Sequence, residues 1–356
     1  MRRLSGVNYI LMDGTFNVAP RGFIQMYTIH GAFLDKSHFT MFYVLMRKRR
    51  ADDYERLFKR LQQYCIQEFN FTLFNKERTV ITDYEKAVFT ALRPYGCNMQ
   101  GCFFHFTQCV YRKVKQIGLS EQYKFHKSVV HLYVRLLMLS ECVKPSLKEA
   151  AFNDLVHSFS TEDVDDDTRT KMTSVFNYFN NTWLNGCFDV KLWSFSGTEM
   201  NTINICESFH SGFTASFPNI SHPNMFIFAN MIYEYERKNM NAFVMSTTTA
   251  YESRKQRSGK TIADTLTCLN ARYADGRIQS LKEYLQPLNK SFGHSIDSAT
   301  ATIGTRIDVN DTTDIEMVQT EEPLSTQFGV TCDIEHRQIH NNVDVEDDEG
   351  VQCTIY

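Results

Sequence analysis

The sequence predicts an α/β protein with a mixed five-stranded sheet, flanking helices and a large all-helical insertion. Three observations predict it: strand-like runs open the chain, strands and helices then alternate, and a long central stretch has only helical spacing. The chain has 356 residues, of which 43% are hydrophobic, so it is long enough to bury a large core.

The first three strands are expected at about residues 7–16, 22–33 and 38–47. Each run is rich in aromatic and aliphatic residues. The turn residues Pro20-Arg21-Gly22 and Asp35-Lys36 separate the runs. Because short connections of this kind join antiparallel neighbours, we expect these strands to form an antiparallel meander.

Two further strands are expected to alternate with helices. The elements are a helix over 52–69, a strand over Arg78–Thr82, a helix over Glu85–Leu92, a strand over Met99–Phe104 and a helix over 105–117. Strands that are entered through helical crossovers lie parallel to their neighbours, so both should be parallel to the first strand. This combination is the ribonuclease H-like architecture, in which the ends of the first and fourth strands lie side by side.

The middle of the chain is expected to form an all-helical insertion over 119–195. Apolar residues recur near every 3.6 positions in three segments, Val129–Ser140, Ser146–Phe159 and Thr168–Trp183. The acidic run Asp163–Asp167 should be a solvated link between two of these helices. Glu207 then opens the helix that returns to the sheet, and Pro223–Met245 forms a long final helix.

These elements divide the chain into four parts. They are the first part of the ribonuclease H-like core (1–118), the helical insertion (119–195), the return of the core with C-terminal helices (196–290) and an acidic tail (291–356). The tail carries two basic and 14 acidic residues, and its polar, charged composition predicts disorder. The net charge of −3 therefore hides a basic body, which suits contact with a polyanion, although an ordinary solvated surface explains it equally well.

Three carboxylates, Asp13, Asp83 and Glu207, are the candidate catalytic and metal-binding residues. The two aspartates follow apolar strand-like runs, and the glutamate opens a distant helix. If they converge, they can hold the divalent ions that phosphoryl transfer needs, Mg²⁺ or its substitute Mn²⁺. Each also has a structural explanation: Asp-Gly is a common hairpin turn, Asp is a common helix N-cap, and glutamate is common on helix surfaces. Their joint placement favours the metal site.

A second group of candidate residues is Cys102, His105 and His210. Cys102 and His105 form a Cys-x-x-His pair at a strand-to-helix junction, and Cys97 and Cys109 lie near enough in sequence to complete a four-ligand Zn²⁺ site. The alternative, which occurs more often, is a buried cysteine beside a hydrogen-bonded histidine. His210 lies one helical turn after Glu207, so the two side chains can face the same cleft.

These motifs resemble the transposase domain of the Mutator-like elements (MULE), a DDE-type family. Asp13-Gly14-Thr15-Phe16 resembles the first-aspartate motif of the family, and Gln25–Gly31 resembles its second strand. Thr82-Asp83-Tyr84-Glu85-Lys86-Ala87 resembles the second-aspartate motif, and Gly101–Gln108 matches the Cys-x-x-His signature. A fifth segment, Thr202–His210, resembles the one that contains the catalytic glutamate, with Ile203 where asparagine is usual. The resemblance covers about 7–215.

The resemblance implies an enzyme that cleaves DNA strands and transfers them, with Asp13, Asp83 and Glu207 as catalytic ligands of Mg²⁺ or Mn²⁺. It also implies DNA as the partner, at the transposon ends and the target, a homo-oligomer on that DNA, and a nuclear location. Members of the family commonly carry an amino-terminal zinc-binding DNA-recognition module. Because this sequence begins almost at the first strand, we expect that module to have been lost or to lie outside this sequence.

Two other functions stay open. One is a domesticated or decayed transposase that binds DNA or protein without catalysis, and the other is a cellular ribonuclease H or exonuclease. The Cys-x-x-His motif and the long insertion before Glu207 argue against the second. The ten cysteines show no disulfide pattern, which favours reduced thiols inside a cell, and no segment reaches the length of an apolar membrane helix.

Overall fold

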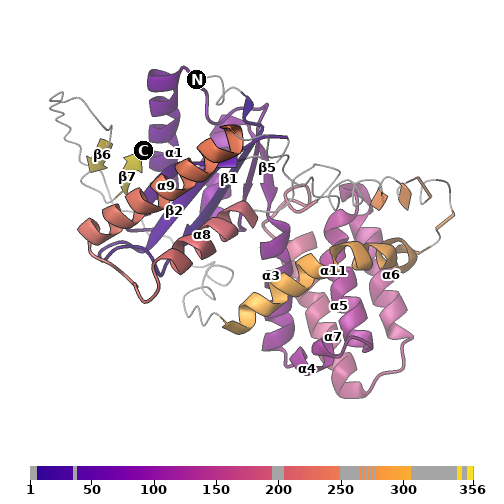
Figure 1. The fold of residues 1–356 in the computed structure, drawn as a ribbon. Coiled ribbons are helices and arrows are strands. Elements are labelled where there is room, and N and C mark those ends of the chain that lie inside the picture. Colours follow the sequence, from indigo (N-terminus) through magenta and orange to yellow (C-terminus); the bar gives the residue numbers. More distant parts are fainter. Residues whose placement is uncertain are drawn as a thin grey trace, which may run out of the picture.

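Two lobes, a sheet with its covering helices and an all-helical lobe, lie side by side (Figure 1). The computed structural model describes residues 6–34, 38–194, 204–248, 265–266, 268–269, 271–272, 275, 277–278, 280–305, 343–346 and 351–355. The strand-rich N-terminal part of the chain forms the first lobe, and α3 leads from it into the second.

The sheet has the strand order β5-β4-β1-β2-β3-β7-β6. Its strands are β1 (Tyr9–Thr15), β2 (Gln25–Ala32), β3 (His38–Met46), β4 (Thr79–Thr82), β5 (Asn98–Gly101), β6 (Val343–Glu346) and β7 (Val351–Ile355). The first three form the expected antiparallel meander, and β4 and β5 continue it on the other side of β1 as parallel strands. The mixed five-stranded sheet with flanking helices that the sequence predicts is therefore present.

Three helices connect the strands of this sheet: α1 (Ala51–Phe69), α2 (Lys86–Leu92) and α3 (Phe103–Gln116). A short 3₁₀ turn, Arg93–Tyr95, follows α2 and contains Pro94, which cannot continue the α-helix. The strand predicted over Met99–Phe104 extends too far at its C-terminal end, since β5 ends at Gly101. Cys102 is already the extended N-cap of α3, because the pairing of β4 with β5 stops at Thr82 and Gly101.

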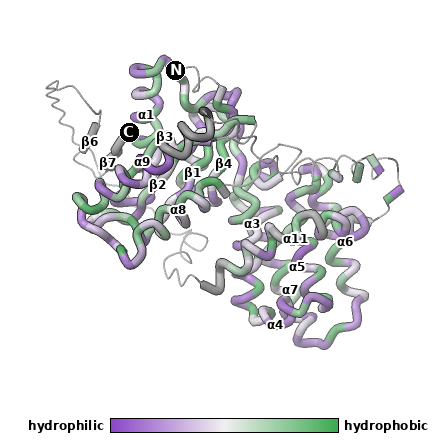
Figure 2. The backbone as a smooth tube through the Cα atoms, in the orientation of Figure 1, coloured by the Kyte–Doolittle hydropathy of each residue, from purple (hydrophilic) through white to green (hydrophobic). Residues whose placement is uncertain are grey.

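Alternate residues of the strands face different layers, as the pleat requires. Along β3, Phe42 and Val44 pack toward α1, whereas Tyr43 and Leu45 pack against α8 (Asn204–Ser216) and α9 (Met225–Thr248). Figure 2 shows that the central strands are predominantly hydrophobic, which agrees with a sheet that is covered on both faces.

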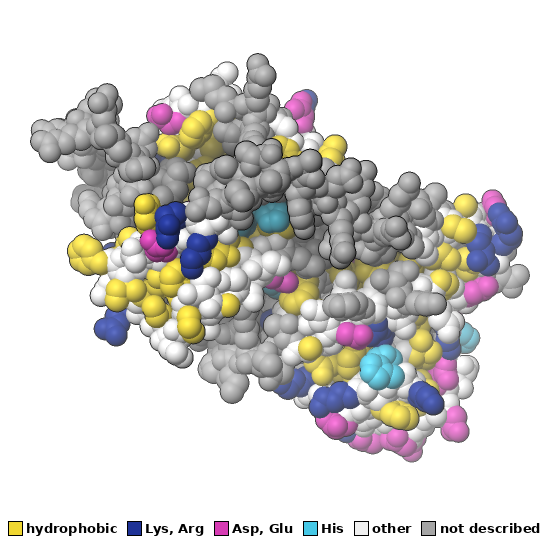
Figure 3. All heavy atoms as spheres, viewed as in Figure 1, with side chains coloured by type: hydrophobic (Ala, Val, Ile, Leu, Met, Phe, Trp, Pro, Cys, Tyr) yellow, Lys and Arg dark blue, Asp and Glu magenta, His cyan; other side chains and the backbone are white. Residues whose placement is uncertain are grey.

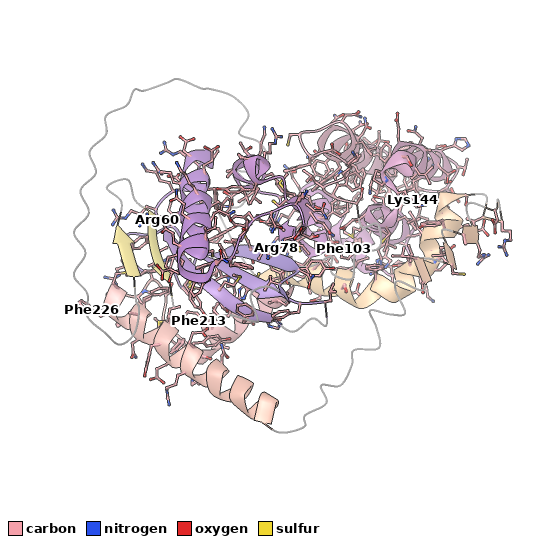
Figure 4. All side chains as sticks on the ribbon, turned by 90° about the horizontal axis from the view of Figure 1, so that it is seen from above. Arg60, Arg78, Phe103, Lys144, Phe213 and Phe226 are labelled. Atoms are coloured by element: carbon pink, nitrogen blue, oxygen red, sulfur yellow. The ribbon has the colours of Figure 1, made fainter. Side chains whose placement is uncertain are left out.

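Helices α8 and α9 cover the second face of the sheet (Figure 1). Phe213 of α8 is fully buried, whereas Phe226 at the start of α9 is 90% exposed. Figure 4 shows this contrast, with Phe213 beside the sheet and Phe226 at the outer edge of the lobe. In Figure 3, hydrophobic side chains gather on the surface of this lobe, over α8 and α9.

The helical lobe packs around a core rich in aromatic residues. It contains α4 (Ser120–Lys124), α5 (Val129–Leu139), 3₁₀ turns at Ser140–Cys142 and Pro145–Leu147, α6 (Lys148–Ser160), α7 (Asp166–Phe179), a π-helical turn at Asn180–Leu184, and α11 (Leu281–Thr305). Trp183 and Trp193 are fully buried there. The ring of Tyr84, which follows β4, lies 4.8 Å from that of Trp183. The core of this lobe therefore reaches the sheet.

Two expectations about acidic segments need correction. Of the run Asp163–Asp167, only the first part is a link, because Asp165 caps α7 by accepting a hydrogen bond from the Thr168 amide and the next two aspartates lie in the first turn. Negative charge at a helix N-terminus is favourable, and the prediction of a solvated link did not take this into account.

The acidic tail expected over 291–356 is not disordered throughout. Residues up to Thr305 belong to α11, where Phe292, Ile296 and Ala299 form a buried stripe at helical spacing. In addition, β7 pairs with β3 and extends the sheet. The remaining tail residues lie outside the described part of the chain. None of the described helices combines the length and apolar character needed to cross a membrane.

Candidate active site

Asp13 lies near the end of β1, on the face of the sheet that α8 covers. It shares this face with Tyr9 and Leu11, which pack against Cys206 of α8. The side chain is almost fully buried, and its Oδ1 accepts a hydrogen bond of 2.9 Å from the Gly14 amide. The strand alternation and the docked helix therefore place a buried carboxylate where α8 begins.

His210 of α8 contacts the carboxylate of Asp13. Its Nδ1 lies 3.4 Å from Asp13 Oδ2, and its Nε2 lies 2.9 Å from the hydroxyl of Thr28. Thr28 is the direct partner of Asp13 in the β1–β2 register, so both contacts hold the imidazole over one strand pair. His210 therefore lies beside the first predicted carboxylate, and the cleft that it should share with Glu207 stays a prediction.

Two histidines and one amide hold the pKa of Asp13 below its ordinary value. Burial raises that pKa, but the hydrogen bond and charge of His210, the charge of His105 and the Gly14 amide together outweigh burial. The carboxylate form of Asp13 is therefore favoured, as a metal ligand requires.

Asp83 directly follows β4, the strand that pairs in parallel with β1. Leu11 is the register partner of Ile81, so continuing the register by two residues brings Asp83 beside Asp13. The Asp83 side chain is half-buried and accepts a hydrogen bond of 3.3 Å from the Thr82 hydroxyl. The adjacency of the two strand ends is the arrangement that the sequence predicts.

Glu207 lies in the first turn of α8 and is half-buried. One ligand atom each of Glu207, Cys102 and His105 lie within 4.8 Å of one another. Burial lowers the pKa of His105, but a hydrogen bond with Cys102 and the negative charges of Asp13 and Glu207 raise it well above its ordinary value. His105 therefore lies within electrostatic range of both Asp13 and Glu207.

The four-ligand zinc site considered from the sequence is not formed by these residues. Cys97 packs into the core between α1 and the sheet, and Cys109 packs into the core of the helical lobe. Cys102 instead lies between β1 and α8. The positions of α3 and α8 thus give the Cys-x-x-His pair a different neighbour, Glu207, which the local sequence does not reveal.

A buried hydrogen-bond network supports the Asp83 side of the site, and sequence reasoning missed it. Glu85 Oε2 accepts hydrogen bonds from Arg49 Nη2 at 3.0 Å and from the Tyr54 hydroxyl at 2.8 Å. Tyr54 in turn accepts one of 2.8 Å from Gln25 Nε2. Burial and the negative charge of Asp83 raise the pKa of Glu85 to about 8, although Arg49 opposes this.

A signal for this network was present in the sequence. Glu85 stands two residues after Asp83 as the N-cap of α2, and Arg49 belongs to the basic run of four residues that precedes α1. An apolar strand end that carries two acidic residues needs a basic partner, and only the packing of α1 shows which arginine supplies it.

The three predicted carboxylates are donors of the type that a hard divalent cation takes, but among the described residues their oxygen atoms do not form a group within 4.8 Å of one another. Carboxylate oxygens are the ligands that Mg²⁺ and Mn²⁺ prefer, and Asp13 is held in its ionised form. Asp13, Asp83 and Glu207 are the residues that could hold such an ion. Such ions activate water and stabilise a leaving oxygen in phosphoryl transfer.

Comparison with known protein families identifies part of the chain. Residues 9–109 match the family model of the MULE transposase domain. The match begins with β1, ends within α3 and includes Asp13, Asp83 and the Cys102–His105 pair, whereas Glu207 lies beyond it. It supports a MULE transposase domain, as the sequence motifs predict. A comparison with curated proteins gives no match.

Proposed function

We propose that this chain is a DDE-type transposase that cleaves DNA strands and transfers them with the help of divalent metal ions. The observation that supports the proposal is that Asp13 and Asp83 belong to the ends of the adjacent parallel strands β1 and β4, while Glu207 lies in the first turn of α8, which packs on β1. The MULE match over residues 9–109 supports the same conclusion. The strand order and directions also fit a ribonuclease H-like core.

In this proposal the three carboxylates hold two Mg²⁺ ions, with Asp13 between Asp83 and Glu207. Bound ions of this kind supply an activated water or 3′-hydroxyl and stabilise the leaving oxygen. The chain itself contributes the fixed positions of the ligands, since two of them follow paired strands and the third belongs to a docked helix. Preorganised ligands avoid the cost of rearrangement during the reaction.

Neighbouring side chains orient these ligands without touching the DNA. His210 is fixed by Thr28 and contacts Asp13, so it keeps one carboxylate oxygen in place. Glu85, held by Arg49 and Tyr54, fixes the segment that carries Asp83. We assign these residues a positioning role.

The partners follow from the same proposal. The transposon end and the target DNA are the substrates, the helical lobe beside the sheet shapes the cleft for them, and the protein acts as a homo-oligomer on DNA in the nucleus. DNA contributes a dense array of phosphates, so binding should weaken steeply as salt is raised.

The decisive test compares the parent chain with Asp83→Asn in a nicking assay on supercoiled DNA. We expect the variant to lose about 10³-fold or more in rate, because metal-ion catalysis supplies several kcal/mol and 1.36 kcal/mol is tenfold. Circular dichroism checks that the variant is folded. Equal nicking rates for the parent and the variant would contradict the assignment of Asp83 as a catalytic residue.

A second candidate is a non-catalytic derivative that binds DNA or protein. One observation favours it: among the described residues, Asp13, Asp83 and Glu207 do not bring their carboxylate oxygens within 4.8 Å of one another. This candidate predicts that the folded parent binds DNA with strong salt dependence but gives no nicking with Mg²⁺ or Mn²⁺. The same assay therefore separates the two functions.

A further inference from the structure

Cys102, His105 and Glu207 form a cluster that the proposed Mg²⁺ chemistry does not explain. Cys102 is the N-cap of α3 and His105 lies in its first turn, while Glu207 comes from the first turn of α8. Their sulfur, nitrogen and oxygen ligand atoms all lie within 4.8 Å of one another. No other such group of three occurs among the residues that the structure describes.

We propose that Cys102, His105 and Glu207 bind a Zn²⁺ ion at a site that shares Glu207 with the carboxylate triad. A thiolate, an imidazole and a carboxylate are the three donor types that zinc proteins use. Mg²⁺ instead prefers oxygen ligands and makes poor use of sulfur. The chemistry of the donors therefore separates this site from the proposed magnesium site, although the two meet at Glu207.

The distances in the cluster are compatible with zinc coordination. Zinc lies about 2.3 Å from sulfur and about 2.0–2.2 Å from nitrogen or oxygen, so tetrahedral ligand atoms lie roughly 3.5 Å apart. The observed limit of 4.8 Å needs a closure of about 1 Å, which side-chain rotation can supply. Cys102 and His105 come from the same N-terminal turn of α3, and Glu207 comes from α8.

The surroundings of the ligands also favour a bound ion. Cys102 is fully buried, in an apolar layer with Leu11, Ile81 and Cys206, which protects a thiolate–metal bond from water. Nδ1 of His105 is buried and has no hydrogen-bond partner among the described residues. Buried polar atoms of this kind normally have a partner, and a metal ion would provide one.

Three protein ligands leave a fourth position for water or a phosphate oxygen, as in zinc sites that act on substrates. On binding, the Cys102 thiol gives its proton to solvent and its sulfur bonds to the metal, so no oxidant or reductant is required. A bound Zn²⁺ would hold Glu207 and remove it from the Mg²⁺ site. We therefore expect zinc to inhibit DNA nicking, a consequence that rests on the proposed function, whereas the zinc site itself does not.

The test uses Co²⁺, a spectroscopic substitute for Zn²⁺, on the reduced full-length chain. We expect one equivalent of Co²⁺ to give a thiolate-to-cobalt charge-transfer band in the near ultraviolet, and Zn²⁺ to displace it. Cys102→Ser should abolish the band. Cys187→Ser is the matched control, since Cys187 is exposed and outside the cluster, and it should keep the band.

Glu207→Gln keeps the proposal falsifiable if Cys102→Ser does not fold. We expect it to raise the dissociation constant for Co²⁺ by more than about 100-fold, beyond the usual effect of residues that only support ligands. A folded parent without a charge-transfer band overturns the site. So does a band that survives in Cys102→Ser, or unchanged Co²⁺ affinity in Glu207→Gln.

A further variant separates this inference from the proposed function. Asp83 lies outside the cluster, so Asp83→Asn should keep the cobalt band while losing Mg²⁺-dependent nicking. If the cobalt results are as expected but Asp83→Asn nicks as well as the parent, the transposase assignment fails and the zinc site stands. If nicking follows the prediction and no variant binds Co²⁺ through sulfur, the zinc site fails alone.

Discussion

The edge of the sheet and the interior of the helical lobe both bury ionisable side chains, but they compensate the charge differently. At the sheet edge, Asp13, Asp83 and Glu207 are carboxylates of like charge from three separate elements. In the helical lobe, Glu141 and Lys148 have opposite charges, are almost fully buried and lie seven residues apart in sequence. The first group brings carboxylates together, whereas in the second, burial favours the uncharged form of each side chain.

The contacts of Lys148 in the helical lobe indicate a structural role rather than a functional site. Lys148 Nζ donates hydrogen bonds to the carbonyls of Ser140 at 2.8 Å and Trp193 at 3.4 Å, and it lies 3.6 Å from the centre of the Trp193 ring. Burial lowers the pKa of Lys148 to about 7, although Glu141 opposes this. Burial also raises the pKa of Glu141 well above its ordinary value.

This comparison teaches that buried charge alone does not mark a functional site. Pairs of opposite charge are common structural features, whereas like charges destabilise a fold when they are brought together. At the sheet edge, burial raises the pKa of Asp13, but His210 and His105 help to hold its carboxylate in the ionised form. Such local conflict between stability and arrangement is expected where function requires it.

The largest expected effect tests the sheet edge directly. Asp13→Asn removes the carboxylate between the other two, so we expect Mn²⁺ binding to be lost and nicking to fall about 10³-fold or more. Calorimetry with Mn²⁺ and the nicking assay measure these losses. Asp52→Asn, an exposed carboxylate in the first turn of α1, is the control. A variant that binds Mn²⁺ as well as the parent would remove the contrast between the two regions.

The second prediction concerns the docking of α8, which brings Glu207 to the edge. Phe213→Ala should lower the free energy of unfolding by about 3–5 kcal/mol, because the ring is fully buried between α8 and the sheet. Phe226→Ala, at a ring that is 90% exposed, should change it by less than about 0.5 kcal/mol. Urea denaturation measures both. Similar values for the two variants would contradict the packing of α8.

The third prediction tests the support behind Asp13. A Cβ added at Gly14 would lie 2.3 Å from Gln25 Oε1, and the Gln25 amide is hydrogen-bonded to Tyr54. Gly14→Ala should therefore destabilise the fold by about 1–3 kcal/mol. In the double variant with Gln25→Ala, the obstacle is absent and part of that loss should be recovered, with a coupling of about 0.5–3 kcal/mol. Strictly additive effects would show that the contact is unimportant.

The smallest expected effect concerns the helical pair and depends on pH. The folded pKa of Glu141 is raised above its ordinary value of 4.5, so the folded protein keeps a proton that the unfolded chain has lost. The stability of the parent should therefore fall as pH rises above about 4.5. Glutamine does not titrate, so Glu141→Gln should gain stability relative to the parent between pH 5 and about pH 8.

The gain depends on the environment of Glu141. Both carboxylate oxygens are buried without a hydrogen-bond partner among the described residues, so ionisation inside the fold is disfavoured and the gain should grow by up to about 1.4 kcal/mol per pH unit. Glu149→Gln is the control, because Glu149 is exposed in the first turn of α6 and should show no trend with pH. Urea denaturation between pH 5 and about pH 8 measures the free energy of unfolding of both variants. If that free energy changes with pH in the same way in both, burial of Glu141 is not the cause.

Local patterns predicted most of the sheet lobe. The meander and the two helical crossovers follow from alternating hydrophobicity, turn residues and the rule that crossovers join parallel strands, all of which act over short stretches of chain. Asp13 and Asp83 could therefore be assigned to neighbouring strand ends without a structure. The match over residues 9–109 covers the same part of the chain.

Composition misled the prediction at the C-terminal end. The stripe Phe292, Ile296 and Ala299 is spread among polar residues, so a tail averaged over 66 positions hides it. Its burial depends on a partner surface on α3 and α5, which lie more than 150 residues earlier, and Arg135 adds an ion pair with Asp297. A short strand such as β7 likewise becomes recognisable only beside β3.

The sequence by itself determined the strand order of the first lobe and which carboxylates end its strands, because these depend on neighbours in the chain. Only the tertiary structure decided that Cys102 and His105 meet Glu207 rather than Cys97 and Cys109. It alone paired Glu85 with Arg49 and Tyr54. These contacts join segments more than 30 residues apart, and their formation depends on how α1, α3 and α8 pack against one sheet.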